Sequence, residues 1–316
     1  MVYGKSPKPV YLWIHDGEVE LRDAAHLWGT LTGDTLKAIR AEHNDPKIRV
    51  IGIGPAGERL VRFACVVDQA RHTAGRCGMG AVMGSKNLKA IACRGTKKPE
   101  LADPEYIKAF AKSFAERVPL NADTNQLHQF GTSNYYANAN AGGALPTRNW
   151  NQAVFEGADH CDHQVIAQEL TIDHDACYAC AVRCKMDVLD ICVFTTAPVR
   201  ITTFDEITRI VQAVTGWNIS FWEIMKAGER GVTLARCFNI KHGLTAKDDY
   251  LPERMFTPAH GGPQDGSFIP KQTFYDGLRL YYEMNGWDRT TGIPTNGKLV
   301  ELDLAWVRDE IQVNRQ

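Results

Sequence analysis

Short alternating runs of apolar and polar residues fill the first hundred positions, a pattern typical of β-strands separated by turns. An apolar-rich run at 9–14 is followed by Asp16 and Gly17 and then by a second run at 19–21, so a β-hairpin is predicted there. A helix is predicted after the hairpin. Further strands, the first two separated by a turn at 54–57, are predicted at 47–53, 60–67 and 88–93.

Helical spacing dominates the rest of the chain. Asp103 and Pro104 suit the N-cap and first turn of a helix, and apolar residues recur behind them at helical intervals as far as Val118. Another helical region is predicted from Phe204 onward, interrupted by a Pro- and Gly-rich surface loop at 251–267. Glycines are predicted to end helices or form turns at Gly216, Gly243 and Gly286.

These patterns predict the α+β class, with an N-terminal mixed β-sheet domain followed by a mainly helical C-terminal region. The predicted boundaries give a β-rich domain at 1–98, a helical segment with a cysteine motif at 99–192 and a C-terminal helical domain at 193–316.

Composition and charge exclude several classes of protein. A length of 316 residues with 44% apolar side chains is sufficient to bury a large core, so a globular protein is predicted. The 36 basic and 37 acidic residues leave a formal charge of −1, which gives no global attraction to nucleic acid or to an anionic membrane surface. No stretch approaches the roughly 18 apolar residues of a membrane-spanning helix, and the first residues lack a signal-peptide pattern. We therefore expect a cytoplasmic protein that binds neither nucleic acid nor membrane.

Four of the nine cysteines lie close together, in a C-x2-C-x3-C run with a fourth cysteine eight residues later. Thiolates at this spacing suit an iron–sulfur cluster, because one stretch of backbone can present three of them. Tetrahedral zinc stays an alternative, since four thiolates satisfy it equally well. Radical enzymes that cleave S-adenosylmethionine use the reverse spacing order and match poorly. The clustered residues are Cys177, Cys180, Cys184 and Cys192. The other five are predicted to pack as small apolar side chains: Cys65, Cys77, Cys93, Cys161 and Cys237.

A glycine-rich segment at 71–91 combines closely spaced glycines with basic side chains. Glycines let backbone amides approach a ligand, and Arg71, Arg76 and Lys86 add positive charge, so the segment suits a phosphate-bearing cofactor. It is not a Walker loop, since its serine precedes the lysine, nor a dinucleotide fingerprint, whose glycine spacing is shorter. A glycine-rich crossover packed tightly on a sheet stays an alternative. The glycines concerned are Gly75, Gly78, Gly80 and Gly84.

Together these motifs resemble the aldehyde ferredoxin oxidoreductase family, whose members hold tungsten, or sometimes molybdenum, between two pterins beside a [4Fe-4S] cluster. Segments similar to the family follow one another in family order through nearly the whole chain. They are Gly4–Gly29, Ile53–Gly57, Ala74–Ile91, Gly131–Thr132, Leu145–Trp150, Cys177–Cys180, Gly228–Arg230, Leu251–Pro252 and Gly286–Trp287.

The resemblance implies a site in which the four clustered cysteines bind the [4Fe-4S] cluster. His72 and Thr73 fall where family members contact a pterin and offer a main-chain carbonyl to a Mg²⁺ ion that bridges the pterin phosphates. The segment 187–196 resembles the second pterin motif, with Asp190 where the family has glycine, and His72 stands where the family tends to have arginine. The implied pterin-binding residues are His72, Thr73, Ala74, Gly75, Arg76, Asp187 and Ile191.

The resemblance also implies a shortened member of the family. The chain begins partway into the family's N-terminal domain, and only Lys185 and Met186 separate Cys184 from Asp187, where the family has most of a helical domain. The family's first pterin aspartate motif and its proton-handling glutamate and histidine lie in that span, so no catalytic side chain is assigned. Apolar side chains on the later helices are expected to be exposed, among them Trp222, Met225 and Phe238.

The activity implied by the resemblance is oxidation of an aldehyde with water to a carboxylate, with electrons leaving singly through the cluster to ferredoxin or a ferredoxin-like subunit. The implied cofactors are a tungsten or molybdenum bis-pterin, the [4Fe-4S] cluster and Mg²⁺, and a homodimer is compatible with the resemblance. Two alternatives stay open. One is an active-site subunit of an aromatic acyl-CoA reductase complex, and the other is a non-catalytic cluster-binding fragment.

Overall fold

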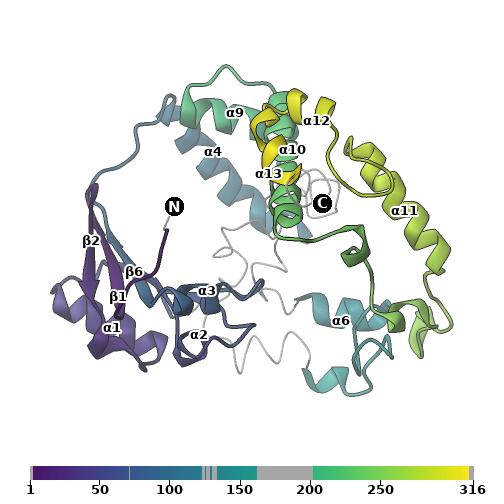
Figure 1. The fold of residues 1–316 in the computed structure, drawn as a ribbon, viewed down its shortest axis with the longest axis horizontal. Helices are drawn as coiled ribbons and strands as arrows, with labels where there is room; N and C mark the ends of the chain where they lie inside the picture. The colour runs from purple at the N-terminus through teal and green to yellow at the C-terminus, as the bar shows by residue number, and fades with distance from the viewer. Residues whose placement is uncertain are drawn as a thin grey trace. The chain divides into compact units, whose positions relative to one another are not determined.

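A computed structural model describes residues 3–70, 72–122, 125, 129, 134–161 and 202–312 of the chain (Figure 1). They divide into two compact units, the first ending at Glu100 and the second beginning at Leu101. The strands all belong to the first unit, and the named elements of the second unit are helices. The predicted α+β class, with a mixed sheet before a mainly helical region, is therefore confirmed.

A six-stranded sheet forms the first unit, in the order β2-β1-β6-β3-β4-β5. β1 and β6 run parallel, and the other neighbouring pairs run antiparallel. The predicted hairpin is confirmed, with positive φ angles at Asp16 and Gly17 in its turn. The strands are β1 (Val10–His15), β2 (Glu18–Asp23), β3 (Arg49–Gly52), β4 (Val66–Asp68), β5 (His72–Ala74) and β6 (Leu88–Arg94).

The main core of the first unit lies between the sheet and the helix α1 (Thr32–Glu42). Tyr11 and Trp13 from β1 pack there with Ile39 from α1. Ile39 lies on the apolar face of α1, and this face packs against the sheet. A second cluster, in which Met83 comes from the helix α3 (Met79–Ser85), is formed by alternate residues of the same strands, among them Val10 of β1 and Leu88 of β6. Short 3-10 helices connect some of the elements: η1 (Ala25–Leu27), η2 (Val118–Leu120), η4 (Ala158–Cys161), η7 (Ala246–Asp248), η8 (Glu253–Phe256), η9 (Gly262–Gln264) and η10 (Ala305–Val307).

The segment after β3 departs from the predicted pair of strands around a turn. Pro55–Glu58 form the short helix α2, because proline fits the first turn of a helix. Leu60 has a left-handed φ of 59°, which a strand cannot accommodate, and the chain continues in turns until β4 begins at Val66. The predicted strand at 60–67 is therefore wrong except for its last two residues.

Glycines bring α2 and α3 into close backbone contact. A Cβ on Gly84 would lie 1.9 Å from the carbonyl oxygen of Gly57, and a Cβ on Gly80 would lie 2.5 Å from that of Cys65. Gly78 has a φ of 65°, and a Cβ there would lie 2.1 Å from the carbonyl oxygen of Arg62. These three glycines of the glycine-rich segment are thus used for packing, the alternative that the sequence left open.

Replacing Gly84 with alanine is expected to lower the free energy of unfolding by about 1–3 kcal/mol, because the new methyl group overlaps a carbonyl oxygen and forces α2 and α3 apart. Gly297→Ala is the matched control, since this helical glycine has open space around its Cβ position. Urea unfolding measures the overall change, and amide hydrogen exchange of residues 55–85 locates it. Equal protection of these amides in both variants would contradict the prediction.

Seven α-helices are described in the second unit. Side-chain caps start four of them: Asp103 accepts from the backbone N–H of Tyr106 at 3.0 Å, Thr295 accepts from that of Lys298 at 3.2 Å, and Thr203 and Ser220 each form a capping box. The predicted helix starts at Asp103 and near Phe204 are confirmed. The helices are α4 (Pro104–Arg117), α6 (Asn134–Ala141), α9 (Phe204–Thr215), α10 (Phe221–Lys241), α11 (Lys271–Met284), α12 (Asn296–Glu301) and α13 (Arg308–Gln312). Gly216, Gly243 and Gly286 follow helix ends with positive φ, as predicted.

The core of the second unit lies where α12 and α13 pack beside α10 (Figure 1). Cys237 and Ile240 from α10 meet apolar side chains from the C-terminal segment. Trp222 and Phe238, on the same helix, are 68% and 62% exposed, as expected from the sequence, whereas Met225 is half-buried. Among the described residues, no helix is both long enough and apolar enough to cross a membrane.

A buried charge network joins α10 to the segments that follow it. Arg236, only 8% exposed, donates from Nε to the carbonyl of Gly292 at 2.9 Å and from Nη1 to Asp249 Oδ1 at 3.0 Å. Its Nη2 lies 2.7 Å from Asp249 Oδ2 as an ion pair, without hydrogen-bond geometry. Tyr282 donates to the same carboxylate, and burial together with that bond raises the pKa of Tyr282 to about 12. The guanidinium also faces the rings of Tyr282 and Trp287.

Candidate functional site

The predicted pterin-binding residues 72–76 lie at an edge of the sheet. His72, Thr73 and Ala74 form β5, which pairs with β4 and is the last strand of the described sheet. An edge strand presents backbone N–H and C=O groups that its own sheet does not use. The segment can therefore offer main-chain hydrogen bonds to a ligand.

The residues that follow β5 are accessible. Gly75, Arg76 and Cys77 are exposed, and Gly78 is the first buried residue of the segment. A Cβ at Gly75 would meet nothing nearer than 3.7 Å, so this glycine leaves open space, in contrast to the three that pack. The glycine-rich segment thus divides into an exposed part that a ligand can reach and a buried part that anchors α3.

The turn before β5 is held by side chains that the sequence did not single out. Gln69 and Ala70 both have left-handed φ angles, of 47° and 57°. Arg40 on α1 donates from Nη2 to Gln69 Oε1 at 2.8 Å and from Nε to the carbonyl of Ile48 at 3.0 Å. The Gln69 amide donates in turn to the carbonyl of Val50 at 3.2 Å. This chain of bonds fixes the position of the edge strand relative to α1 and β3.

A pocket of about 460 Å³ adjoins the β4–β5 hairpin. Its walls are the start of α1, the segment 54–57 at the start of α2, and Cys65, Val67 and Ala70. Val67 pairs with Thr73 across the hairpin, so the pocket lies next to the predicted cofactor residues although it does not include them. The segment 54–57, predicted from the sequence as a turn and noted for its resemblance to the family, contributes a wall.

A buried ion pair supports the same region. Lys89 on β6 is fully buried, and its Nζ donates to Glu58 Oε1 at 2.5 Å and to the carbonyl of Thr30 at 2.8 Å. Glu58 Oε2 accepts from the backbone N–H of Gly29 at 2.8 Å. The pair ties the end of α2 to the segment that leads into α1. Sequence reasoning had placed Lys89 within a strand but gave it no role, since burial of a charge depends on partners distant in the chain.

The other predicted site residues lie outside the described part of the chain: Cys177, Cys180, Cys184, Cys192, Asp187 and Ile191. Arg71 lies outside it too, as do the side chain and surroundings of Cys161. Within the described residues, no group of three or more histidine, cysteine or carboxylate side chains is arranged to hold a metal ion.

The scattered cysteines differ from their predicted role. Cys237 is buried as expected, and burial raises the pKa of its thiol to about 11. Cys65 is half-buried, and Cys77 and Cys93 are exposed, so the prediction that these two pack as apolar side chains was wrong. Cys77 has a left-handed φ of 68° at the turn into α3. Cys93 lies near the end of β6, where its side chain is exposed.

Two family models match the chain over most of its length. The model of the aldehyde ferredoxin oxidoreductase N-terminal domain matches residues 1–95, and the model of domains 2 and 3 of the same enzymes matches residues 109–189 and 185–304. The first match contains the whole sheet, the edge strand and the adjoining pocket.

Several characterised proteins are similar to part of the chain. A tungsten-containing aldehyde ferredoxin oxidoreductase from Pyrococcus abyssi is 40% identical over 185 residues, which are 58% of this chain and 30% of the relative. The enzyme of that name from Thermococcus kodakarensis is 39% identical over 58% of this chain and 31% of its own length. The WOR-like subunit of an aliphatic sulfonate oxidoreductase from Pyrococcus furiosus is 30% identical over 71% of this chain and 37% of its own. The chain thus spans about a third of the length of these relatives.

A solved structure has a similar fold. It is the active-site complex BamBC of benzoyl coenzyme A reductase with 1,5-dienoyl-CoA, which aligns with 99% of this chain and 82% of its own at a TM-score of 0.64. At 18% identity the likeness concerns the fold alone. The two family models together match residues of both units, and this match shows the family of the chain. The chain belongs to the aldehyde ferredoxin oxidoreductase family.

Proposed function

We propose that this chain is an aldehyde-oxidising oxidoreductase that converts an aldehyde and water into a carboxylate, three protons and two electrons. The electrons leave one at a time through a [4Fe-4S] cluster to ferredoxin or a ferredoxin-like subunit. The observation that carries the proposal is the edge strand β5 followed by the exposed Gly75, within the region that the N-terminal family model matches. The names of two similar proteins support tungsten as the metal and aldehydes as the substrate class.

The exposed part of the glycine-rich segment fits a phosphate-bearing pterin. The edge strand has unused backbone groups, Gly75 adds no side chain, and the exposed Arg76 brings a permanent positive charge close to them. In this proposal His72–Arg76 hold the pterin phosphates, with a main-chain carbonyl near Thr73 available to Mg²⁺. His72 keeps a hydrogen-bond donor but lacks the bidentate fork of arginine. Tungsten or molybdenum bound by two pterins would supply the two-electron chemistry.

The remaining ligands of the proposed site are assigned by resemblance alone. Asp187 and Ile191 would contact the second pterin, and Asp190 stands where the family has glycine. A side chain at that position restricts how closely the backbone can approach a ring system. The second pterin is therefore proposed to bind more weakly than the first.

The proposed cluster gives a direct test. Protein purified without oxygen is expected to be brown, to contain about four iron atoms per chain under the four-cysteine assignment, and to give an electron paramagnetic resonance signal once reduced. Cys180→Ser should lower the iron content and remove that signal. Cys93→Ser is the matched control, because Cys93 is exposed and lies in the sheet, outside the cysteine motif. Stoichiometric zinc without iron would contradict the cluster assignment.

A second candidate function is that of an active-site subunit in an aromatic acyl-CoA reductase complex. The similar fold of the benzoyl coenzyme A reductase complex favours it. Affinity purification of the chain from its own cells would distinguish the two, since an acyl-CoA reductase subunit should bring further electron-transfer subunits with it. Absence of both pterin and iron from anaerobic protein would favour the third reading, a non-catalytic fragment.

A further inference from the structure

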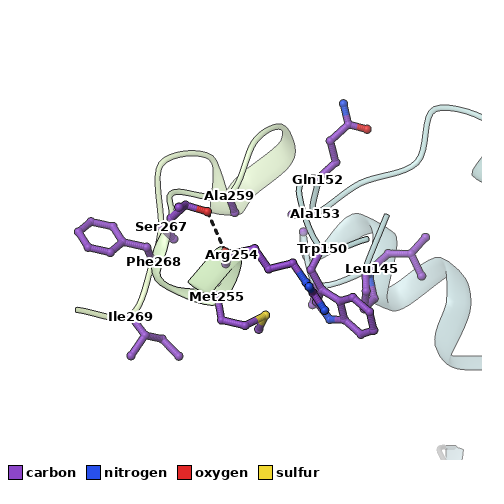
Figure 2. Close-up of a pocket in the computed structure, with 14 residues that line it drawn as sticks. Leu145, Trp150, Gln152, Ala153, Arg254, Met255, Ala259, Ser267, Phe268 and Ile269 are labelled. Carbon is purple, nitrogen blue, oxygen red and sulfur yellow. Dashed lines mark hydrogen bonds between the residues drawn. The ribbon is translucent and has the colours of Figure 1, made fainter. Parts of the chain in front are cut away.

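A pocket of about 370 Å³ lies in the second unit, remote in sequence from the glycine-rich segment (Figure 2). Its walls come from two loops, residues 143–153 and 254–269. The loops are joined by a hydrogen bond from the backbone N–H of Ala153 to the carbonyl of His260, at 3.1 Å, and by a bridge between Gln152 and His260. The walls are therefore held together by backbone contacts and form a preshaped cavity.

The first loop places an aromatic ring on the pocket. Arg148, Asn149 and Trp150 have consecutive left-handed φ angles of 49°, 59° and 65°. Such a run is costly for residues with side chains and persists only where surrounding bonds impose it. Here the bridge between Thr147 and Gln152 closes the turn. The result is that the Trp150 ring lies on the pocket wall, 52% exposed.

The second loop directs Arg254 across the pocket toward that ring. Its neighbours in η8 are anchored on α11, because Glu253 pairs with Lys271 and the Phe256 ring meets Phe274 edge-on at 5.6 Å. Arg254 points the other way, and its guanidinium carbon lies 5.8 Å from the centre of the Trp150 ring, as Figure 2 shows. Stacking on the ring leaves the edge of the guanidinium, with its N–H groups, available.

The guanidinium edge lacks an acceptor. Arg254 Nε is buried and has no hydrogen-bond partner, and among the described residues no carboxylate lies within ion-pair distance of Arg254. A buried N–H on a charged group is costly when unpaired, so an anionic oxygen placed beside it is strongly favoured. Gln152 has an unpaired buried oxygen as well, but Figure 2 shows its amide directed away from Arg254.

Most of the remaining lining is apolar: Leu145, Pro146, Met255, Phe268 and Ile269. We propose that this pocket binds a small organic carboxylate with an apolar body, its carboxylate on Arg254 and its body against Trp150 and the apolar wall. A planar carboxylate matches the guanidinium fork. A phosphate dianion, with more charge to solvate, suits this wall less. The proposal is independent of aldehyde oxidation.

The test is a titration of the full chain with hexanoate and with hexanamide, its neutral counterpart, followed by ligand-detected nuclear magnetic resonance. Hexanoate is expected to bind at least about tenfold more tightly than hexanamide, because only the anion forms charge-assisted hydrogen bonds. Arg254→Gln should weaken hexanoate binding by about the same factor and leave hexanamide unaffected. Arg279→Gln is the matched control, since Arg279 is an exposed arginine of α11 that is paired with Asp276.

Three results would overturn the proposal: equal affinity for the two ligands, unchanged hexanoate binding by Arg254→Gln, or binding of inorganic phosphate as tight as that of hexanoate. Circular dichroism establishes that each variant is folded. If Arg254→Gln does not fold, Arg254→Lys replaces it. The lysine keeps the charge but not the fork, so hexanoate should bind it less tightly than it binds the unaltered chain.

Discussion

The 316-residue chain is expected to oxidise aldehydes about 10²- to 10⁴-fold more slowly than a full-length relative, even when loaded with tungsten and pterin. The resemblance places the family's proton-handling glutamate and histidine between Cys184 and Asp187, and only two residues separate these positions here. The alignments with the aldehyde ferredoxin oxidoreductases cover about 30% of the length of those relatives. Without a positioned base, water or the hydrated aldehyde loses the contribution of general acid–base catalysis.

An anaerobic assay with a viologen dye as electron acceptor and several aldehydes measures this, with the metal and pterin content determined on the same sample. A full-length relative assayed in parallel is the control for the cofactor preparation. Turnover at ordinary enzyme rates, roughly 1 to 10³ per second, would contradict the prediction. It would mean that side chains of this chain replace the family's proton-handling groups.

Replacing Asp249 with alanine is expected to lower the free energy of unfolding by about 3 kcal/mol, the lower end of the range for broken buried ion pairs. The change removes the counter-ion of Arg236 and the acceptor of the Tyr282 hydroxyl together. Arg236 would keep its bond to the Gly292 carbonyl but remain a buried charge. The side chain of Asp249 is 26% exposed, so water can partly replace it, which is why the lower end applies.

Urea unfolding followed by circular dichroism measures the loss, and hydrogen exchange in α10 and α11 assigns it to the second unit. Asp276→Ala is the control, because this exposed carboxylate of α11 contacts only the exposed side chains of Arg279 and Gln272 on its own helix in the described contacts and should leave the midpoint unchanged. Tyr282→Phe, which removes the hydroxyl alone, should cost less than Asp249→Ala. Equal midpoints for Asp249→Ala and Asp276→Ala would show that the network contributes nothing.

Local signals predicted much of the fold correctly. The hairpin turn at Asp16 and Gly17, the helix start at Asp103 and the helix end at Gly216 depend on backbone preferences of a few adjacent residues, and all three are confirmed. The strand predicted at 60–67 is wrong before Val66: its apolar residues suit a strand, whereas the left-handed Leu60 and the close contact of α2 with α3 prevent one. That contact involves Gly84, distant in sequence.

By itself, the sequence determined the α+β class and the family, because these follow from local periodicity and from motifs of adjacent residues. The segments assigned to the cofactor stay a prediction. Only the tertiary structure decided which glycines pack and which one stays open, as Gly84 and Gly75 illustrate. It also decided that Lys89 is a buried partner of Glu58, and that Arg254 faces Trp150 across a pocket. The physical reason is the same in each case: burial and pairing depend on atoms brought together from distant parts of the chain, and no local pattern records them.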